Sequence, residues 1–89
     1  MIYTLKGILM NYAAHTPKQL GQVLKGQRKS QKLTQKDAAR AVGLLPKTVS
    51  KLELATETAT VESLFKLLSA LQLELVVRSK SQASPTREW

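Results

Sequence analysis

A single glycine, Gly43, divides two stretches of helical character within residues 34–53, TQKDAARAVGLLPKTVSKLE. A glycine inside one continuous helix would cost about 1 kcal/mol relative to alanine. Glycine can, however, adopt the left-handed conformation that ends a helix without a side-chain clash. Ala39, before the glycine, leaves room for a second helix to cross closely. The segment therefore predicts two short helices joined by a corner, a helix-turn-helix.

Start signals for helices surround this corner. Thr16 stands before a proline and predicts a helix over about residues 17–31, because threonine can cap a helix and proline suits the first helical position. Thr34 and Pro46 open the two helices of the corner, and Thr60 caps a fourth helix. We expect the fourth helix to be mostly buried, because its apolar residues repeat at helical spacing. These residues are Val61, Leu64, Phe65, Leu67, Leu68 and Leu71.

A change of period follows the fourth helix. In residues 72–78, QLELVVR, the period shifts toward two and places Leu73, Leu75 and Val77 on one face, which indicates a short strand. The alternative is that the fourth helix continues through this segment. A single strand has no hydrogen-bond partner in a helical domain, so we expect it to pair with the same strand of a second protomer. The predicted fold is mainly α, with four to five helices and one short C-terminal strand that pairs across a dimer.

These elements divide the chain into four parts. We expect an N-terminal segment without an assigned structure over residues 1–16, a helix-turn-helix domain over 17–72, a dimerisation strand over 73–79 and a flexible tail over 80–89. The last part is polar and shows no period, which is typical of a tail without packed structure.

Basic residues are concentrated between residues 18 and 51 of the predicted domain. This range contains nine cations but only one acid, Asp37. Nine cations minus one acid give this segment a charge of +8, which equals the net charge of the whole chain. Such an excess is typical of a nucleic-acid-binding surface, although a solvated surface without a partner is the alternative. The cations are Lys18, Lys25, Arg28, Lys29, Lys32, Lys36, Arg40, Lys47 and Lys51.

Other classes of function find little support in the composition. The chain has no cysteine, which excludes disulfides, thiolate metal sites and thiol nucleophiles, and fits a reducing cytoplasm. It has no nucleophile–base set, metal-ligand cluster or phosphate-binding loop, so we expect neither an enzyme nor a cofactor or metal. No apolar run approaches the ~18 residues of a membrane span. The few aromatic residues lie outside the basic segment, which disfavours binding of single-stranded RNA.

The residues around the corner resemble those of a known family. Counted from Gln35 as the first position, alanine stands fifth, glycine ninth and valine fifteenth, with apolar residues at four, eight, ten and eighteen. This pattern resembles the helix-turn-helix of the phage-repressor-like, or Xre-like, transcriptional regulators. The resemblance covers about residues 17–71.

Segments beside the corner narrow the resemblance. The stretches TPKQLGQVLKGQRKSQKLTQ and SLFKLLSALQLEL, and the ending ASP…EW, are similar to the corresponding segments of the HipB-like antitoxins of HipA/HipB toxin–antitoxin modules. The resemblance implies a homodimer that binds a palindromic operator in double-stranded DNA, represses its own operon and binds a HipA-like serine/threonine kinase toxin. It also implies that a tail carrying Trp89 contacts the toxin, with an idle terminal residue as the alternative.

The resemblance also implies residue roles, because a recognition helix enters the major groove with its first residues facing base edges. The base-contacting positions are then Leu45, Pro46, Lys47, Ser50 and Lys51. The DNA backbone would be contacted by Gln35, Thr48, Lys25, Arg28, Lys29, Lys36 and Arg40. Leu45 and Pro46 depart from the polar residues of many relatives, and Leu45 would pack against a thymine methyl group or within the turn. Family members often pair an arginine of the first helix with a glutamate ending the recognition helix, which matches Arg28 and Glu53 and favours a structural role for this arginine.

The sequence leaves two other functions open. One is a stand-alone Xre-like repressor without a toxin partner, against which an adjacent reading frame for a kinase would argue. The other is a protein-interaction adaptor whose helix-turn-helix no longer reads DNA, as the apolar Leu45 and Pro46 suggest. A steep salt dependence of DNA binding would argue against the adaptor.

Overall fold

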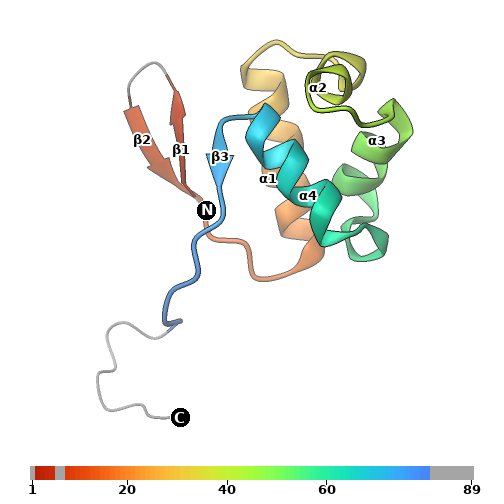
Figure 1. Cartoon of the computed structure of the whole chain (residues 1–89). Coiled ribbons are helices and arrows are strands. Elements are labelled where there is room, and N and C mark those ends of the chain that lie inside the picture. Colours follow the sequence, from red (N-terminus) through yellow and green to blue (C-terminus); the bar gives the residue numbers. More distant parts are fainter. Residues whose placement is uncertain (1, 6–7, 81–89) are drawn as a thin grey trace.

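The computed structural model describes residues 2–5 and 8–80, and Figure 1 shows its order of elements. The elements are β1 (Ile2–Leu5), β2 (Ile8–Asn11), α1 (Pro17–Ser30), α2 (Gln35–Ala41), α3 (Pro46–Leu54), the 3₁₀ turn η1 (Thr56–Thr58), α4 (Val61–Ala70) and β3 (Leu73–Glu74). Within the described ranges, four α-helices and a short C-terminal strand confirm the predicted mainly α class. None of the helices in these ranges combines the length and the apolar character that a membrane span requires.

Threonine caps define where three of the helices begin. Thr16 Oγ1 accepts a hydrogen bond from the Gln19 backbone N–H at 3.1 Å, and Thr60 caps α4 in the same way. At the start of α2, Thr34 Oγ1 accepts from the Asp37 N–H at 3.0 Å, and the Asp37 carboxylate accepts from the Thr34 N–H at 3.1 Å. The Thr34 N–H holds the pKa of the Asp37 carboxyl below its usual range, because it stabilises the charged form.

The corner between α2 and α3 has the conformation that its glycine predicts. Gly43 adopts a φ of +72°, and the N–H of Leu44 donates to the Ala39 carbonyl at 2.9 Å. Ala39 is buried where α2 and α3 pack together. The predicted helix-turn-helix corner is therefore confirmed.

The core lies among the four helices and reaches β3. Helix α1 also approaches the end of α3 closely, because a Cβ added at Gly21 would collide with the backbone carbonyl of Glu53. Glycine at this position therefore sets the distance between α1 and α3. The buried apolar residues are Leu24, Ala38, Ala39, Val49, Leu52, Leu67, Leu68, Leu71 and Leu73.

The expectation that the fourth helix is mostly buried was wrong for its first half. Leu67 and Leu68 are buried, but Val61 and Phe65 are 67% and 49% exposed. These two residues are one turn apart, so they share a face of α4 that points away from the core. Helical spacing alone identified the apolar residues, but it did not show that they occupy two faces.

The C-terminal strand is shorter than predicted, and it has a partner in its own chain. β3 contains only Leu73 and Glu74, whereas a strand over residues 73–79 was expected. It runs antiparallel to β1, with Glu74 opposite Ile2, and the sheet order is β2-β1-β3. The premise that a strand here lacks an intrachain partner was therefore wrong. β1 begins at Ile2, so the described part of β1 ends opposite Glu74 and the ladder stops there.

Two further expectations concern the ends of the chain. The alternative that the fourth helix continues is wrong, because α4 ends at Ala70 and Gln72 turns the chain with a φ of +59°. The N-terminal segment, to which the sequence assigned no structure, contains the antiparallel pair β1 and β2. The predicted flexible tail and its Trp89 lie outside the described residues, apart from residue 80.

We expect Gly43→Ala to lower the free energy of unfolding by about 1–2 kcal/mol, because a side chain strains a left-handed backbone. Gly26→Ala is the matched control, since Gly26 lies inside α1 and an added Cβ meets nothing within 4 Å. This control should raise the free energy of unfolding by up to about 1 kcal/mol. Urea unfolding followed by circular dichroism measures both values, and effects of the same sign would contradict the structural role of the corner.

Candidate nucleic-acid interface

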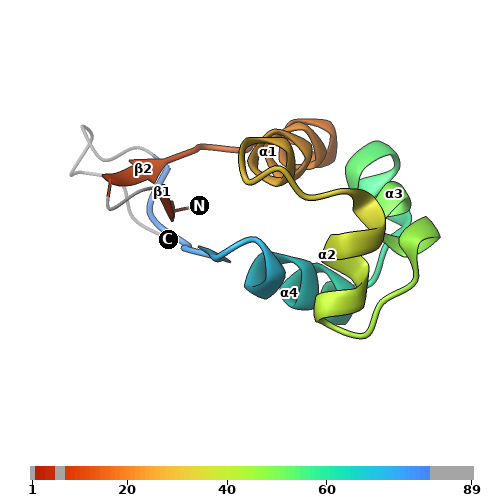
Figure 2. The same cartoon turned by 90° about the horizontal axis from the view of Figure 1, so that it is seen from above.

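Helices α2 and α3 form the side of the molecule that lies away from the strands. Figures 1 and 2, which view the chain along perpendicular directions, both place the sheet at one end and α2 with α3 at the other. One side of α3 packs into the core through Val49 and Leu52. Its opposite side faces outward, and this side carries the predicted base-contacting residues.

The outward side of α3 contains the residues that helical spacing places together. Lys47 and Lys51 are exposed and lie one turn apart, with the half-buried Ser50 beside them. Leu54 continues the same row and is 74% exposed. The sequence motif does not single out this leucine, although its spacing of three from Lys51 and seven from Lys47 places it on this face.

The start of α3 is apolar and projects from the molecule. Leu45 occupies the N-cap position without a side-chain cap hydrogen bond, and its side chain is 59% exposed. Pro46 follows as the first helical residue and is also exposed. Thr48 is half-buried, and its N–H donates to the Leu45 carbonyl at 2.9 Å. Packing within the turn therefore leaves more than half of the Leu45 side chain accessible to a partner.

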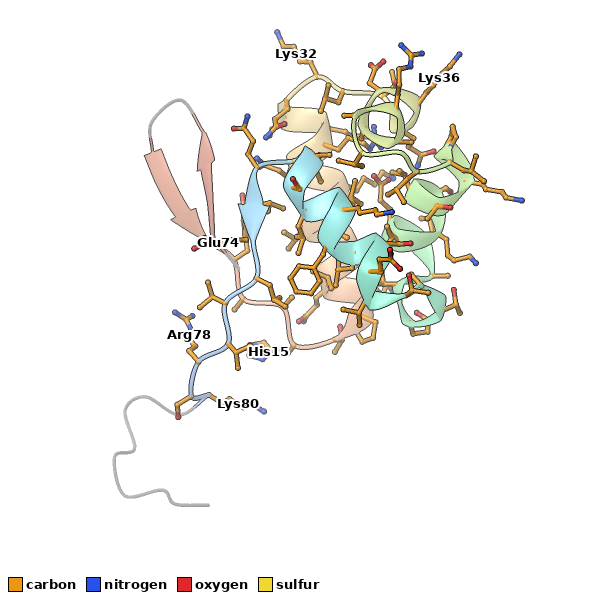
Figure 3. The ribbon with its side chains drawn as sticks, in the orientation of Figure 1. His15, Lys32, Lys36, Glu74, Arg78 and Lys80 are labelled. Carbon is orange, nitrogen blue, oxygen red and sulfur yellow. The ribbon has the colours of Figure 1, made fainter. Side chains whose placement is uncertain are left out.

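The described structure leaves the cations of this region largely unopposed. Eight of the nine cations between residues 18 and 51 are exposed, and Arg28 is the exception. Asp37 is the only exposed acid in the same range. Figure 3 shows Lys32 and Lys36 extending outward from the turn before α2 and from α2 itself. The other exposed cations are Lys18, Lys25, Lys29, Arg40, Lys47 and Lys51.

Arg28 is buried in an ion pair that joins α1 to α3. Its Nε donates to Glu53 Oε2 at 2.6 Å, and its Nη2 donates to Glu53 Oε1 at 3.2 Å. Its remaining terminal nitrogen donates to the Leu33 carbonyl at 2.8 Å. The structure therefore brings together the arginine and the glutamate that the family pattern paired, and the arginine side chain faces inward.

Gln35 belongs to the same network. Its Nε2 donates to Glu53 Oε1 at 3.1 Å, and its side chain is partly buried. The sequence assigned Gln35 to the DNA backbone and did not predict this link. This contact joins residues far apart in the sequence and depends on how α2 and α3 cross. No local sequence motif predicts it. The amide of Gln35 is thus held in a fixed position at the start of α2.

The geometry of these helices agrees with a comparison against known families. A family model described as helix-turn-helix, HTH_3, matches residues 24–77. The chain belongs to this helix-turn-helix family. The match contains α2, the corner and α3, together with α4 and the segment that follows it. The Xre-like resemblance of the sequence is therefore confirmed.

Relatives within this family are HipB proteins. Antitoxin HipB of Escherichia coli is 30% identical over 71 residues, which are 80% of this chain and 81% of the relative. A solved complex of a HipB variant with an O2 20mer has a TM-score of 0.76 at 25% identity and covers 80% of this chain and 99% of that chain. A solved HipA-HipB-O2-O3 complex gives a TM-score of 0.75 at 26% identity, over 79% of this chain and 99% of that chain. These similarities confirm the predicted HipB-like character.

We expect Glu53→Gln to lower the free energy of unfolding by about 3–5 kcal/mol, because it leaves the charge of Arg28 buried without its partner. The double variant Arg28→Met, Glu53→Leu removes both charges and should recover a large part of this loss. Urea unfolding of the wild type and both variants measures the difference. A loss below about 1 kcal/mol for Glu53→Gln would indicate that the pair behaves like an exposed one.

Proposed function

We propose that this chain is a DNA-binding antitoxin that acts as a homodimer, represses its own operon at a palindromic operator and binds a HipA-like serine/threonine kinase toxin. The observation that carries the proposal is the helix-turn-helix of α2 and α3, within a segment, residues 18–51, that has eight exposed cations and one exposed acid. The kinship with HipB supports the antitoxin role. A HipB relative in a complex that also contains HipA supports a HipA-like partner.

In the proposed complex, the outward side of α3 lies in the major groove. Lysine side chains donate to the acceptors of guanine, and Ser50 can both donate and accept. The base contacts are assigned to Leu45, Pro46, Lys47, Ser50 and Lys51. The two apolar residues at the start of α3 can contact thymine methyl groups but make no side-chain hydrogen bonds. Sequence preference is therefore expected to depend mainly on Lys47, Ser50 and Lys51.

The phosphate contacts are assigned to residues of three helices. Gln35 lies in the first turn of α2, where free backbone N–H groups and the helix dipole favour an anion. Lys25, Lys29, Lys36 and Arg40 are exposed and can approach the DNA backbone, with Thr48 at the start of α3. We exclude Arg28 from this set, because its guanidinium is occupied by Glu53 and the Leu33 carbonyl.

The proposed dimer uses the segment that follows β3. Leu73 is buried in its own domain, whereas Leu75 and Val77 are 44% and 91% exposed. Among the described residues, the segment 75–79 belongs to no strand and has no strand paired with it. Pairing with the same segment of a second protomer would satisfy its backbone groups. A two-fold dimer then presents two copies of α3 to successive turns of a palindromic site, about 34 Å apart.

Lysine substitutions separate phosphate contacts from base contacts. Lys36→Ala should reduce by about 1 the slope of the logarithm of the DNA association constant against the logarithm of the salt concentration. Lys47→Ala should weaken the free energy of binding to the preferred DNA sequence by about 1–3 kcal/mol and reduce the preference for that sequence over others. Lys66→Ala is the control, since Lys66 lies on α4 beside Glu62 at 3.7 Å. Fluorescence anisotropy with duplexes tiled across the region upstream of the gene measures these changes. Binding that is weak and independent of salt would favour the adaptor over the antitoxin.

Co-purification tests the toxin partner. We expect the product of the adjacent gene to purify with this chain as a kinase-like protein, and deletion of residues 80–89 to weaken that complex, because the tail is assigned to the toxin through Trp89. Deletion of the tail should leave DNA binding intact, which serves as the control for folding. A chain that purifies alone as a dimer and still binds its own promoter would instead be a stand-alone repressor.

A further inference from the structure

Two glutamines at the end of α1 hold the end of α4. Gln27 and Gln31 are one turn apart, so they lie on the same face of α1. Gln27 Nε2 donates to the Leu71 carbonyl at 3.2 Å, and Gln31 Nε2 donates to the same oxygen at 2.8 Å. A carbonyl oxygen has two lone pairs, so it can accept both hydrogen bonds. We call these two glutamines and the Leu71 carbonyl the glutamine clamp.

The clamp is buried, which makes its hydrogen bonds costly to break. Gln27 is 3% exposed, and Leu71 is fully buried. Ser30 Oγ donates to the Gln27 backbone carbonyl at 2.9 Å and lies 3.4 Å from the side-chain oxygen of Gln27. The amide oxygen of Gln27 therefore faces Ser30, and its NH₂ group faces Leu71. A buried carbonyl that loses its donors pays a desolvation penalty, so the clamp resists separation of the two helix ends.

The clamp stands at the junction between the helices and the segment that the proposed dimer uses. Leu71 is the C-cap residue of α4, and Gln72 turns the chain directly after it with a φ of +59°. A side chain is disfavoured in this left-handed region, so the surroundings must hold the turn in place. β3 follows at Leu73, and residues 75–79 come next. We call residues 75–79 the dimer segment.

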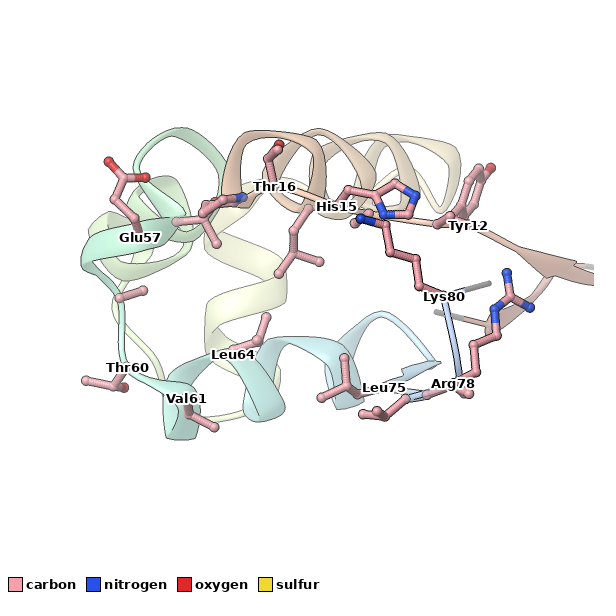
Figure 4. A pocket seen from close by; sticks show the side chains of 18 of the residues that line it. Tyr12, His15, Thr16, Glu57, Thr60, Val61, Leu64, Leu75, Arg78 and Lys80 are labelled. Atoms are coloured by element: carbon pink, nitrogen blue, oxygen red, sulfur yellow. The ribbon is translucent and has the colours of Figure 1, made fainter. Parts of the chain in front are cut away.

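No polar contact ties the dimer segment to a helix. In the described part of the chain, no hydrogen bond or ion pair joins residues 75–80 to α1, α2, α3 or α4. A hollow of about 850 Å³ lies between these residues and the linker of residues 12–17, and Figure 4 shows Leu75 and His15 on its two sides. The polar contacts that direct the dimer segment therefore lie before it, at Gln72 and the glutamine clamp.

We propose that Gln27 and Gln31 are positioning residues, which set the orientation of the helix-turn-helix relative to the dimer segment and thereby the distance between the two copies of α3. This inference rests on the homodimer of the proposed function. Figures 1 and 2 place β3 at one end of the molecule and α3 at the other, so a rotation at the junction is magnified at α3. A constant distance between two recognition helices lets a dimer prefer one half-site spacing.

The two donors of the clamp predict a non-additive effect of substitution. Methionine has a similar length to glutamine but carries no N–H donor. Gln27→Met or Gln31→Met alone leaves the Leu71 carbonyl with one donor, whereas the double variant leaves it with none. We therefore expect the single variants to behave like the wild type and the double variant to have a loose junction. Gln22→Met is the matched control, because Gln22 is exposed on the same helix and lies outside the clamp.

The absence of cysteine allows a direct measurement of the distance between the two α3 helices. Leu54→Cys places one spin label on the exposed end of α3 in each protomer. Pulsed electron–electron double resonance of the dimer, without DNA, should give a narrow distance distribution for the parent, the control and each single variant. The double variant should give a broader distribution. Equal widths would overturn the inference alone, whereas the absence of any defined distance in the parent would overturn the proposed dimer as well.

A second variant leaves the buried Gln27 unchanged. Gln31→Glu places an acceptor-only carboxylate against the Leu71 carbonyl at neutral pH, and Gln31 is only partly buried, so the domain should still fold. We expect this variant to broaden the distance distribution, whereas Gln22→Glu, which carries the same charge change, should not. Far-UV circular dichroism checks that every variant is folded. A narrow distribution for Gln31→Glu would contradict the role of the clamp.

DNA binding provides an independent readout. Duplexes carry two half-sites of the preferred sequence, with their separation varied in single base pairs around one helical turn, at one salt concentration. The wild type and Gln22→Met should prefer one separation. The double methionine variant should bind that duplex about tenfold more weakly if about a tenth of its dimers hold the required distance. Its affinity for a duplex with one half-site should be unchanged. An equal loss on every duplex would indicate general damage to the fold and would overturn the positioning role.

Discussion

The buried pair of Arg28 and Glu53 is the interaction on which the arrangement of the helices depends. Burial of two charges carries a desolvation penalty, which is offset only by good geometry and by further hydrogen bonds. Both conditions hold, because the guanidinium makes two hydrogen bonds to the carboxylate and a third to the Leu33 carbonyl. Gln35 adds a fourth from the start of α2. The pair of Arg28 and Glu53 thus connects α1, the turn after it, α2 and the end of α3. It fixes the outward side of α3 relative to the other helices.

The same pair shapes the electrostatics of the surface. Glu53 is one of only two acids between residues 18 and 53, and its charge is buried and neutralised by Arg28. Asp37 is bound to the first turn of α2 through its hydrogen bonds with Thr34. The eight exposed cations therefore meet little opposing charge, and their field extends outward over α2 and α3. The buried pair of Arg28 and Glu53 therefore contributes both to the stability of the fold and to the excess of positive charge on the surface.

Local chemistry explains which parts of the structure the sequence could predict. The threonine caps and Gly43 act on the backbone beside them, so the helix starts and the corner were evident in the sequence. The pairing of β1 with β3 joins opposite ends of the chain, and no short motif in Ile2–Leu5 announces it. The link from Gln35 to Glu53 likewise depends on how two helices cross. Whether Val61 and Phe65 are exposed depends on which side of α4 packs against the core. Helical periodicity alone does not predict that side.

Exposed apolar side chains lie on both halves of the described structure. Leu45 and Leu54 are exposed on the outward side of α3, beside its lysines, and a second group lies on α4 and over residues 75–77. A chain of 89 residues buries too little surface to enclose all of its apolar side chains. In the proposed DNA complex, a leucine beside lysines would contact a thymine methyl group, while the lysines would approach guanine or the phosphates. The buried network of Arg28 and Glu53 holds this side of α3 in place relative to the other helices.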